Sequence, residues 1–334
     1  MTGRRGVVDR RPRALLAFDP PSLAGDIFSA DLRRRLGAAV RLDPELVLTE
    51  TASGRARAAL AEVEVLIAGW GAPQVASALV PQLRAVVYAG GVARTCLADP
   101  HELAARGVLA ANARAANAVP VAEYTLATIL LANKGAAAAE RELRARRTTP
   151  PARAGIGNFG RTVGIVGASQ VGRKVIELLR PFDLQVLVHD PELSADEAGR
   201  LGVQTGTLLE VAAGSHVLSL HQPLTPATVG QIDARVLAAL PDGATVINTA
   251  RGAVLDEAAL VAELRTGRLE AVLDVTDPEP PAPESELWDL PNVTLTPHIA
   301  GSMGNELHRI GRAVTDEVER FVAGQPLRHH EDLG

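Results

Sequence analysis

The first part of the chain alternates short apolar runs with segments in which apolar residues recur every three or four positions. The apolar runs predict buried strands at residues 14–19, 46–49, 63–68, 83–88 and 108–110. Residues 32–39 carry helical spacing. Strands that alternate with helices pair in parallel through crossover connections. We therefore expect an α/β domain over residues 14 to about 115.

The same alternation resumes after residue 160. Strands are predicted at residues 163–166, 184–189, 203–205, 217–220, 244–248, 269–273 and 293–296. Helices are predicted after the first of these strands, up to Pro181, and at residues 208–213, 232–240, 256–264 and 304–322. The two halves therefore look like two versions of one α/β plan.

A single long helix is predicted over residues 120–146, between the two halves. Pro120 suits its first turn, and Pro150-Pro151 closes the segment. A long helix that bridges two α/β units is a plausible hinge, so we place the domain boundary near residues 115–125.

A glycine turn follows the first strand of the second half. Residues 163–166 form that strand, residues 167–172 the turn, and a helix begins behind it. The free N–H groups of such a helix start point at a phosphate. The next strand ends in Asp190, about 20 residues past the turn, where a carboxylate accepts hydrogen bonds from an adenosine ribose. This order predicts a dinucleotide site, and Asp190 disfavours the alternative of an α/β domain that binds no nucleotide.

The turn departs from the G-x-G-x-x-G fingerprint at one position, since Ser169 stands where the middle glycine is expected. Either the serine hydroxyl hydrogen-bonds a phosphate, or the side chain holds the cofactor slightly further out.

Polar side chains follow the ends of the later strands. Arg251, Asp274, His298 and His221 each come just past a predicted strand, and Glu279 lies in a Pro-rich loop after Asp274. Ligands of open parallel sheets bind at the carboxyl ends of strands, so these groups should share the rim that carries the glycine turn. An enzyme that reduces a carbonyl beside a carboxylate needs a cation, a proton donor and a carboxylate that keeps the donor protonated.

Each of these residues has an alternative structural role. Arg251 could be a surface arginine, and His298 could be a capping or core histidine. Their position beside Glu279 favours acid–base chemistry. In the first half, Gly90-Gly91-Val92 follows a strand directly and can bring backbone N–H groups to a small anion, although an ordinary loop explains these glycines equally well.

Five segments together resemble the D-isomer-specific 2-hydroxyacid dehydrogenase family. They are residues 164–172 with Asp190, 221–225, 248–252, 273–279 and 296–301. The likeness extends from about residue 60 to residue 322. It implies a Rossmann NAD-binding domain of residues 119–302 inserted into a flavodoxin-like substrate domain of residues 1–118 and 303–334. It also implies a homodimer.

The resemblance assigns roles residue by residue. It implies a carboxylate clamp at Arg251, an acid/base at His298 and the partner of that histidine at Glu279. Substrate contacts fall on Gly90, Gly91, Val92, Arg251 and His298. Cofactor contacts fall on Gly167, Ser169, Gln170, Val171, Gly172, Asp190, His221, Pro223, Thr228, Thr249, Ala250, Asp274 and His298. Asp274 would lie near the nicotinamide amide, and Asp190 favours NAD because it repels a 2′-phosphate.

The expected activity is therefore NAD-dependent interconversion of a 2-oxoacid and a D-2-hydroxyacid. Two alternatives stay open: a regulatory protein of this fold that binds NAD(H), and a dehydrogenase of this fold for formate or phosphite. In the loop after Gly91 the family usually has a polar Asp-Asn-type pair, whereas this chain reads Val92-Ala93-Arg94-Thr95. Arg94 either favours a more anionic substrate or faces solvent.

Composition narrows the choice of partners. A net charge of −5 and 3% aromatic residues give no support to nucleic-acid or anionic-membrane binding. The lone Cys96 indicates a reducing, cytoplasmic compartment. The longest apolar run, residues 118–132, is short and contains Glu123, so no transmembrane helix is expected.

The remaining charged and histidine-rich segments predict little chemistry. The arginine-rich Met1–Arg13 is expected to be a frayed arm, and the tail His329-His330-Glu331-Asp332 a flexible polar segment rather than a metal site. No metal site is expected elsewhere. Solvated histidines are predicted at positions 101, 216, 308, 329 and 330.

Overall fold

The computed structural model describes residues 11–151 and 155–334. It divides into a discontinuous unit, Met1–Asn117 with Ser302–Gly334, and an inserted unit, Ala118–Gly301. Both predicted boundaries lie one residue from these limits. Most of the predicted N-terminal arm, residues 1–10, lies outside the described residues.

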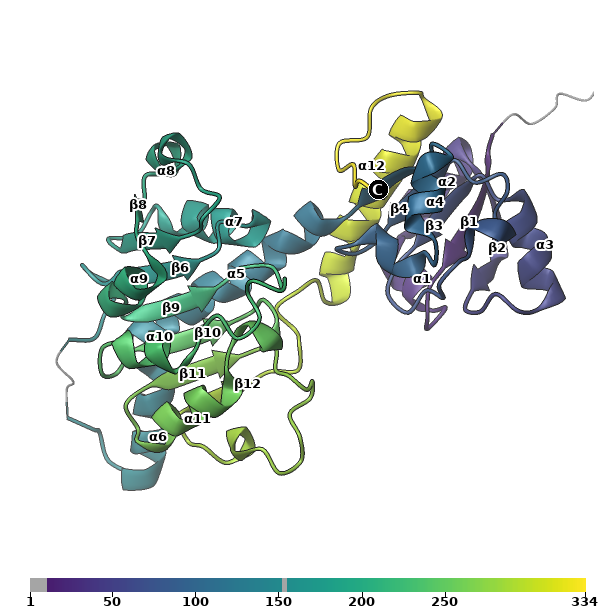
Figure 1. The fold of residues 1–334 in the computed structure, drawn as a ribbon. Coiled ribbons are helices and arrows are strands. Elements are labelled where there is room, and N and C mark those ends of the chain that lie inside the picture. The colour runs from purple at the N-terminus through teal and green to yellow at the C-terminus, as the bar shows by residue number, and fades with distance from the viewer. Residues whose placement is uncertain (1–10, 152–154) are drawn as a thin grey trace, which may run out of the picture. The chain divides into compact units, whose positions relative to one another are not determined.

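The discontinuous unit is built on a five-stranded parallel sheet in the order β2-β1-β3-β4-β5 (Figure 1). This is the flavodoxin-like strand order. The strands are β1 (Arg13–Ala17), β2 (Arg41–Leu48), β3 (Val65–Ala68), β4 (Ala85–Tyr88) and β5 (Leu109–Asn112). The helices are α1 (Leu23–Ile27), α2 (Ala30–Ala39), α3 (Gly54–Glu62), α4 (Pro100–Ala105) and α12 (Leu307–Val322). Helix α12 returns from the C-terminal end of the chain to pack on α1, α2 and β4, with Ile310, Val314 and Val318 buried.

The inserted unit has a seven-stranded parallel sheet in the order β12-β11-β10-β9-β6-β7-β8. The strands are β6 (Thr162–Val166), β7 (Gln185–His189), β8 (Gln204–Thr205), β9 (Val217–Leu220), β10 (Thr245–Asn248), β11 (Glu270–Leu273) and β12 (Val293–Leu295). The helices are α5 (Arg114–Asn133), which begins in the other unit, α6 (Ala136–Arg146), α7 (Gln170–Leu179), α8 (Ala195–Leu201), α9 (Leu208–Gly214), α10 (Ala234–Ala239) and α11 (Glu257–Arg265). The direction of winding reverses between β6 and β9, which is the switch point where Rossmann folds bind ligands. The predicted fold class is confirmed.

The predicted long helix over residues 120–146 is wrong in two respects. It is two helices, because Gly135 adopts a left-handed conformation (φ +58°) between α5 and α6. Helix α5 also begins earlier than predicted, so Pro120 lies inside it and not in its first turn. The Asn112 side chain accepts a hydrogen bond from Arg114 N (3.1 Å), which satisfies an amide at this earlier start.

Among the described residues, α5 alone is long and apolar enough to meet a length-and-hydropathy criterion for a membrane span, contrary to expectation, and 33% of that window is buried. Its side chains nevertheless bond to strand ends of the inserted unit. Thr125 Oγ1 lies 3.1 Å from Thr249 Oγ1, and Tyr124 Oη lies 3.1 Å from Thr296 Oγ1. We therefore interpret α5 as a packed helix of the α/β fold.

Candidate active site

The glycine turn is packed too tightly for any other residue at two positions. Gly167 has φ +94°, and a Cβ there would lie 2.5 Å from Gln222 N. A Cβ on Gly172 would lie 2.1 Å from Gly167 O, so helix α7 starts directly against the turn. Within the described residues, the amides at 169, 170 and 171 donate to no protein group. Three neighbouring free amides at a helix start form a cradle for a phosphate.

Ser169 is the N-cap of α7. Its backbone is extended (φ −63°, ψ −178°), so a Cβ is accommodated without strain. Its Oγ accepts a hydrogen bond from Gly172 N (3.3 Å). The hydroxyl proton is left to donate to an anion. The departure from the glycine fingerprint is thus a capping residue, a third role beside the two expected for Ser169.

Asp190 lies against this turn. One carboxylate oxygen accepts from Ala168 N (2.6 Å) and the other from Glu192 N (2.8 Å). A carboxylate has about four acceptor positions, so two are left for other donors such as ribose hydroxyls.

His221 and Gln222 are buried beneath the turn, at the end of β9. The His221 ring bonds to Ser219 Oγ through Nε2 (2.9 Å). Burial lowers the pKa of His221 to about 3, so the ring is neutral near pH 7. His221 Nδ1 and Gln222 Oε1 are buried and have no protein partner in the described part of the chain. These open positions beside free amides fit a polar ligand such as a dinucleotide.

The loop after Gln222 is closed by Thr228. Its hydroxyl donates to Pro223 O (2.6 Å) and accepts from Thr225 N (2.8 Å). The structure therefore gives Thr228 a role in shaping this loop, in addition to its predicted cofactor contact.

His298 and Glu279 form a hydrogen-bonded pair on the same rim. His298 Nδ1 lies 2.7 Å from Glu279 Oε1, and the two side chains are 49% and 43% exposed. An ionised carboxylate only accepts hydrogen bonds, so Nδ1 carries the proton, and Nε2, which has no hydrogen-bond partner in the described part of the chain, is left for chemistry. The backbone of His298 is left-handed, with φ +54°. This conformation is strained for a residue with a side chain and must be held by its surroundings.

Asp274 holds the His298 loop. Its carboxylate is buried (2% exposed) and accepts from Thr296 Oγ1 (2.6 Å), Ile299 N (2.9 Å) and Ala300 N (2.9 Å). The Asp274 carbonyl accepts from His298 N (3.0 Å). Asp274 therefore fixes both sides of the strained histidine, a function that the sequence analysis missed.

Arg251 is exposed on the loop that follows β10. The Asn248 side chain fixes this loop by donating to Arg251 O (2.9 Å) and accepting from Ala250 N (3.0 Å). A Cβ on Gly252 would lie 2.0 Å from the carbonyl carbon of Thr276, so this loop packs on the one that carries Glu279. The loops after β10, β11 and β12 thus bring a cation, a carboxylate and an imidazole to one edge of the inserted unit.

The discontinuous unit has its own run of free amides, at residues 90–92 after β4. The three carbonyls of this run accept from Ala113 N (2.9 Å), Arg114 Nε (3.0 Å) and Thr95 Oγ1 (2.7 Å). The three amides have no partner among residues 11–151 and 155–334. Because the carbonyl oxygens of this loop already accept hydrogen bonds and its N–H groups are free, the loop is suited to bind an anion.

The chain that carries these two runs of free amides and the polar rim matches a known protein family. The sequence profile of the D-isomer specific 2-hydroxyacid dehydrogenase, NAD binding domain, matches residues 126–300, more than half of the chain. The chain belongs to the D-isomer-specific 2-hydroxyacid dehydrogenase family. The matched residues lie within the inserted unit, so a nicotinamide dinucleotide is its cofactor.

Individual members of the family differ in substrate and cofactor. The D-3-phosphoglycerate dehydrogenase of Mycobacterium tuberculosis is 35% identical over 74% of this chain and 47% of its own length. The apo D-mandelate dehydrogenase of Rhodotorula graminis is 26% identical, with a TM-score of 0.76, over 96% of this chain and 97% of the other. An NADPH-dependent glyoxylate/hydroxypyruvate reductase of Sinorhizobium meliloti, in complex with NADP and malonate, is 25% identical, with a TM-score of 0.72, over 97% of each chain. The chain spans about half the length of the curated relatives it matches.

The C-terminal tail is not the flexible segment that was predicted for this family member. His329 O accepts from Asn112 N (3.1 Å), Glu331 N donates to Ala110 O (2.8 Å), and Leu333 is buried (2% exposed). Strand β5 is an edge strand, and its unpaired backbone groups recruit the tail. Arg94 was expected at the substrate or in solvent, but its guanidinium donates to Asp332 O (2.8 Å).

One histidine was also misassigned. His216 was predicted to be solvated, but its Nδ1 accepts from Thr162 N (3.1 Å) and its burial lowers its pKa. Among the described residues, no three His, Cys, Asp or Glu side chains gather as metal ligands would.

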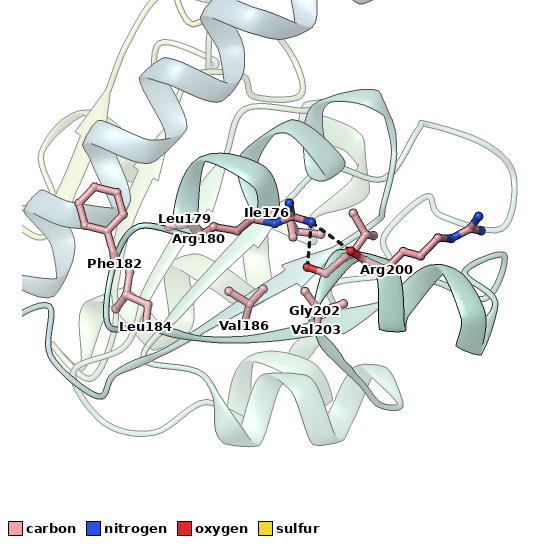
Figure 2. Close-up of a pocket in the computed structure, with 10 residues that line it drawn as sticks. Ile176, Leu179, Arg180, Phe182, Leu184, Val186, Arg200, Gly202 and Val203 are labelled. Atoms are coloured by element: carbon pink, nitrogen blue, oxygen red, sulfur yellow. Dashed lines mark hydrogen bonds between the residues drawn. The ribbon is translucent and has the colours of Figure 1, made fainter.

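A cavity of about 380 Å³ lies in the inserted unit away from this rim (Figure 2). It is lined by Ile176 and Leu179 of α7, by Val186 near the amino end of β7, and by Arg180. Arg180 donates to the carbonyls of Arg200 (3.1 Å) and Leu201 (3.4 Å), so its charge serves the C-terminal end of α8. The cavity lies at the opposite end of the strands from Asp190, and we assign it no part in the chemistry.

Proposed function

We propose that this protein interconverts a 2-oxoacid and a D-2-hydroxyacid with NAD(H), with His298 as the acid/base. The observation that carries the proposal is the 2.7 Å bond between His298 Nδ1 and Glu279 Oε1 on the rim that also presents Arg251. A core or capping histidine would not need a half-exposed carboxylate partner and a strained backbone.

The nicotinamide, when bound, supplies the hydride for the carbonyl carbon. His298 Nε2 donates a proton to the carbonyl oxygen as negative charge develops there. Glu279 accepts from Nδ1–H, which orients the ring and leaves Nε2 for the substrate. Arg251 offers a cation to the substrate carboxylate, since among the described residues its guanidinium makes one hydrogen bond, from Nη1 to Ala250 O (2.6 Å).

The amides of Gly90, Gly91 and Val92 are proposed to bind a substrate carboxylate. Their free donors and fully used carbonyls support binding of an anion and argue against an ordinary loop.

NAD is the proposed cofactor in preference to NADP. The Asp190 carboxylate beside the glycine turn would repel a 2′-phosphate at close range. Comparing kcat/KM for NADH and NADPH tests this, and equal values would contradict it.

The test of the activity is NADH oxidation against a panel of 2-oxoacids that range from glyoxylate to phenylpyruvate and 2-oxoglutarate. In the His298→Ala protein, kcat should fall by roughly 10²–10⁴-fold while NADH still binds. The control is His308→Ala, which removes an exposed histidine of the other unit. Wild-type turnover that survives His298→Ala would sink the assignment, and silence across the panel with NADH bound would favour a regulatory NAD(H)-binding protein.

We also propose that the protein is a homodimer. Apolar side chains of the inserted unit are exposed near the end of α5: Leu131 (59%), Ile156 (45%) and Phe159 (84%). Gly157 N donates to Asn133 O (2.7 Å), which holds the Ile156–Phe159 segment to the helix. Exposed apolar groups gathered in this way are typical of a protein interface.

A further inference from the structure

The loop that carries the free amides of residues 90–92 is held by a carboxylate from the other end of the chain. Glu331 accepts from Ala93 N (2.8 Å), from Arg94 N (3.2 Å) and from Asn112 Nδ2 (2.7 Å). All these residues belong to the discontinuous unit. Three donors on one carboxylate use most of its acceptor positions, so this is a dedicated contact.

The tail that carries Glu331 is itself firmly anchored. The buried carboxylate of Glu317 in α12 accepts from Arg328 N (3.0 and 3.2 Å). His330 bridges to Ala111 in antiparallel fashion, and Leu333 enters the core cluster that contains Tyr88 and Ala93. Glu331 is therefore fixed in position, and its hydrogen bonds hold the loop in place.

Arg94 adds a contact in which the loop supplies the side chain and the tail supplies the backbone group. Its backbone amide donates to Glu331, while its guanidinium donates to Asp332 O. Arg94, which lies in the segment that departs from the Asp-Asn-type pattern of the family, thus binds the tail. The loop and the tail hold each other through both a carboxylate and a guanidinium.

This attachment decides which amides an anion can reach. Glu331 uses the amides of Ala93 and Arg94, and Ala89 N donates to Ala68 O (2.7 Å). The free run is therefore bounded on both sides and comprises residues 90–92. Without Glu331 the amides at 93 and 94 would compete for the anion, and the turn would be free to rearrange.

We propose that Glu331 is a positioning residue for substrate binding, which holds the loop so that the amides of residues 90–92 receive the substrate carboxylate. The proposal rests on the proposed function of that loop. Glu331 itself touches neither substrate nor cofactor.

The experiment compares Glu331→Ala and Glu331→Gln with Glu50→Ala in the full-length protein. Glu50 is a matched control, because its carboxylate also accepts backbone amides in the same unit, from Ala52 and from Ser53 N (3.0 Å), but at the start of α3. Glutamine keeps one acceptor oxygen at position 331 and turns an NH₂ toward the remaining donors, so it should rescue part of the effect.

For Glu331→Ala we expect KM for the 2-oxoacid to rise about tenfold or more, with kcat changed less than about twofold and NADH affinity unchanged. Glu331→Gln should be intermediate, and Glu50→Ala should match the wild type. Hydrogen exchange at the amides of Ala93 and Arg94 should accelerate in Glu331→Ala, less in Glu331→Gln and not in Glu50→Ala. A general loss of folding would lower kcat and NADH binding as well, and so would separate from this pattern.

Two results would overturn the proposal: an unchanged KM in a Glu331→Ala protein that turns over, or unchanged exchange at residues 93 and 94. If the wild type reduced none of the oxoacids, the proposed function would fall. The exchange rates would then still decide whether Glu331 anchors the loop.

Discussion

Replacing Asp274 by Asn should damage catalysis more than cofactor binding. The substitution keeps the size of the side chain and removes one acceptor oxygen. In one orientation the new NH₂ faces Ala300 N at the position where Oδ2 now accepts at 2.9 Å. In the other orientation it faces Ile299 N, which Oδ1 now accepts at 2.9 Å. Either way a buried donor meets a donor.

The magnitude follows from those contacts. A hydrogen bond to a charged group contributes about 1.5–3 kcal/mol, and an unsatisfied buried amide costs about 1–3 kcal/mol. The lost hydrogen bond and the unsatisfied amide are partly the same cost and do not add in full, so the free energy of unfolding should fall by roughly 2–4 kcal/mol. The left-handed backbone of His298 costs on the order of 1–2 kcal/mol, and Asp274 holds it. Each 1.4 kcal/mol lost lowers the ratio of competent to incompetent conformers about tenfold, so a loss that exceeds the present preference by about 1.4–2.8 kcal/mol should lower kcat roughly 10–100-fold.

The assay is steady-state kinetics at saturating NADH, together with urea unfolding and NADH titration. The control is Asp289→Asn, an exposed aspartate of the inserted unit whose side chain makes no hydrogen bond or ion pair among the described residues. The NADH dissociation constant should stay within a few-fold of the wild type. A kcat within twofold of the wild type would refute the claim that Asp274 holds His298 in place.

Three further outcomes are expected. Gly167→Ala should lower the free energy of unfolding by about 2–5 kcal/mol and abolish tight NADH binding, because residue 167 has a positive φ and its new Cβ would lie 2.5 Å from Gln222 N. The control is Gly199→Ala, inside α8 with open space around it, which should raise the free energy of unfolding by about 0.5–1 kcal/mol. Because burial lowers the pKa of His221 from 6.5 to about 3, the unfolded chain binds an extra proton between these pH values. The contribution of His221 to the free energy of unfolding should therefore be fully present above pH 6.5 and should fall below that pH by up to about 1.4 kcal/mol per pH unit. His221→Gln should reduce this slope. Phe159→Glu should convert the proposed dimer to monomer in sedimentation experiments at a concentration where the wild type is dimeric, and a wild type that is monomeric throughout would contradict the proposed interface.

The strands were predictable because burial on both faces makes them continuous apolar runs. Strands β3, β4 and β9 are buried at every residue, and each coincides with a predicted run. The helix α3 was missed because its arginine- and alanine-rich sequence has little apolar periodicity. Its N-cap, Ser53, accepts from Ala56 N (3.2 Å) and was the available signal.

The candidate site divides in the same way. Glu279 and His298 follow neighbouring strands, so the topology alone brings their loops to one edge. The roles of Asp274 and Glu331 depend on which backbone amides their oxygens reach, and no periodicity in a sequence encodes that. For Glu331 the amides lie more than 230 residues away along the chain, as the separation of 238 from Ala93 shows.

The two proposed anion sites, one in each unit, are bounded in the same way. In the inserted unit the free amides at 169–171 are bounded by Ala168 N, which donates to Asp190, and by Gly172 N, which donates to Ser169 Oγ. In the discontinuous unit the run 90–92 is bounded by a strand hydrogen bond and by Glu331. In both places a side-chain oxygen accepts a hydrogen bond from the amide next to the free run. An anion would therefore meet three free amides and no more. A carboxylate next to an anion site opposes the ligand by charge, and it is tolerated because its own hydrogen bonds fix the geometry of the donors. The proposed preference for NAD follows from the same arrangement, because a 2′-phosphate near Asp190 would bring further negative charge to that carboxylate.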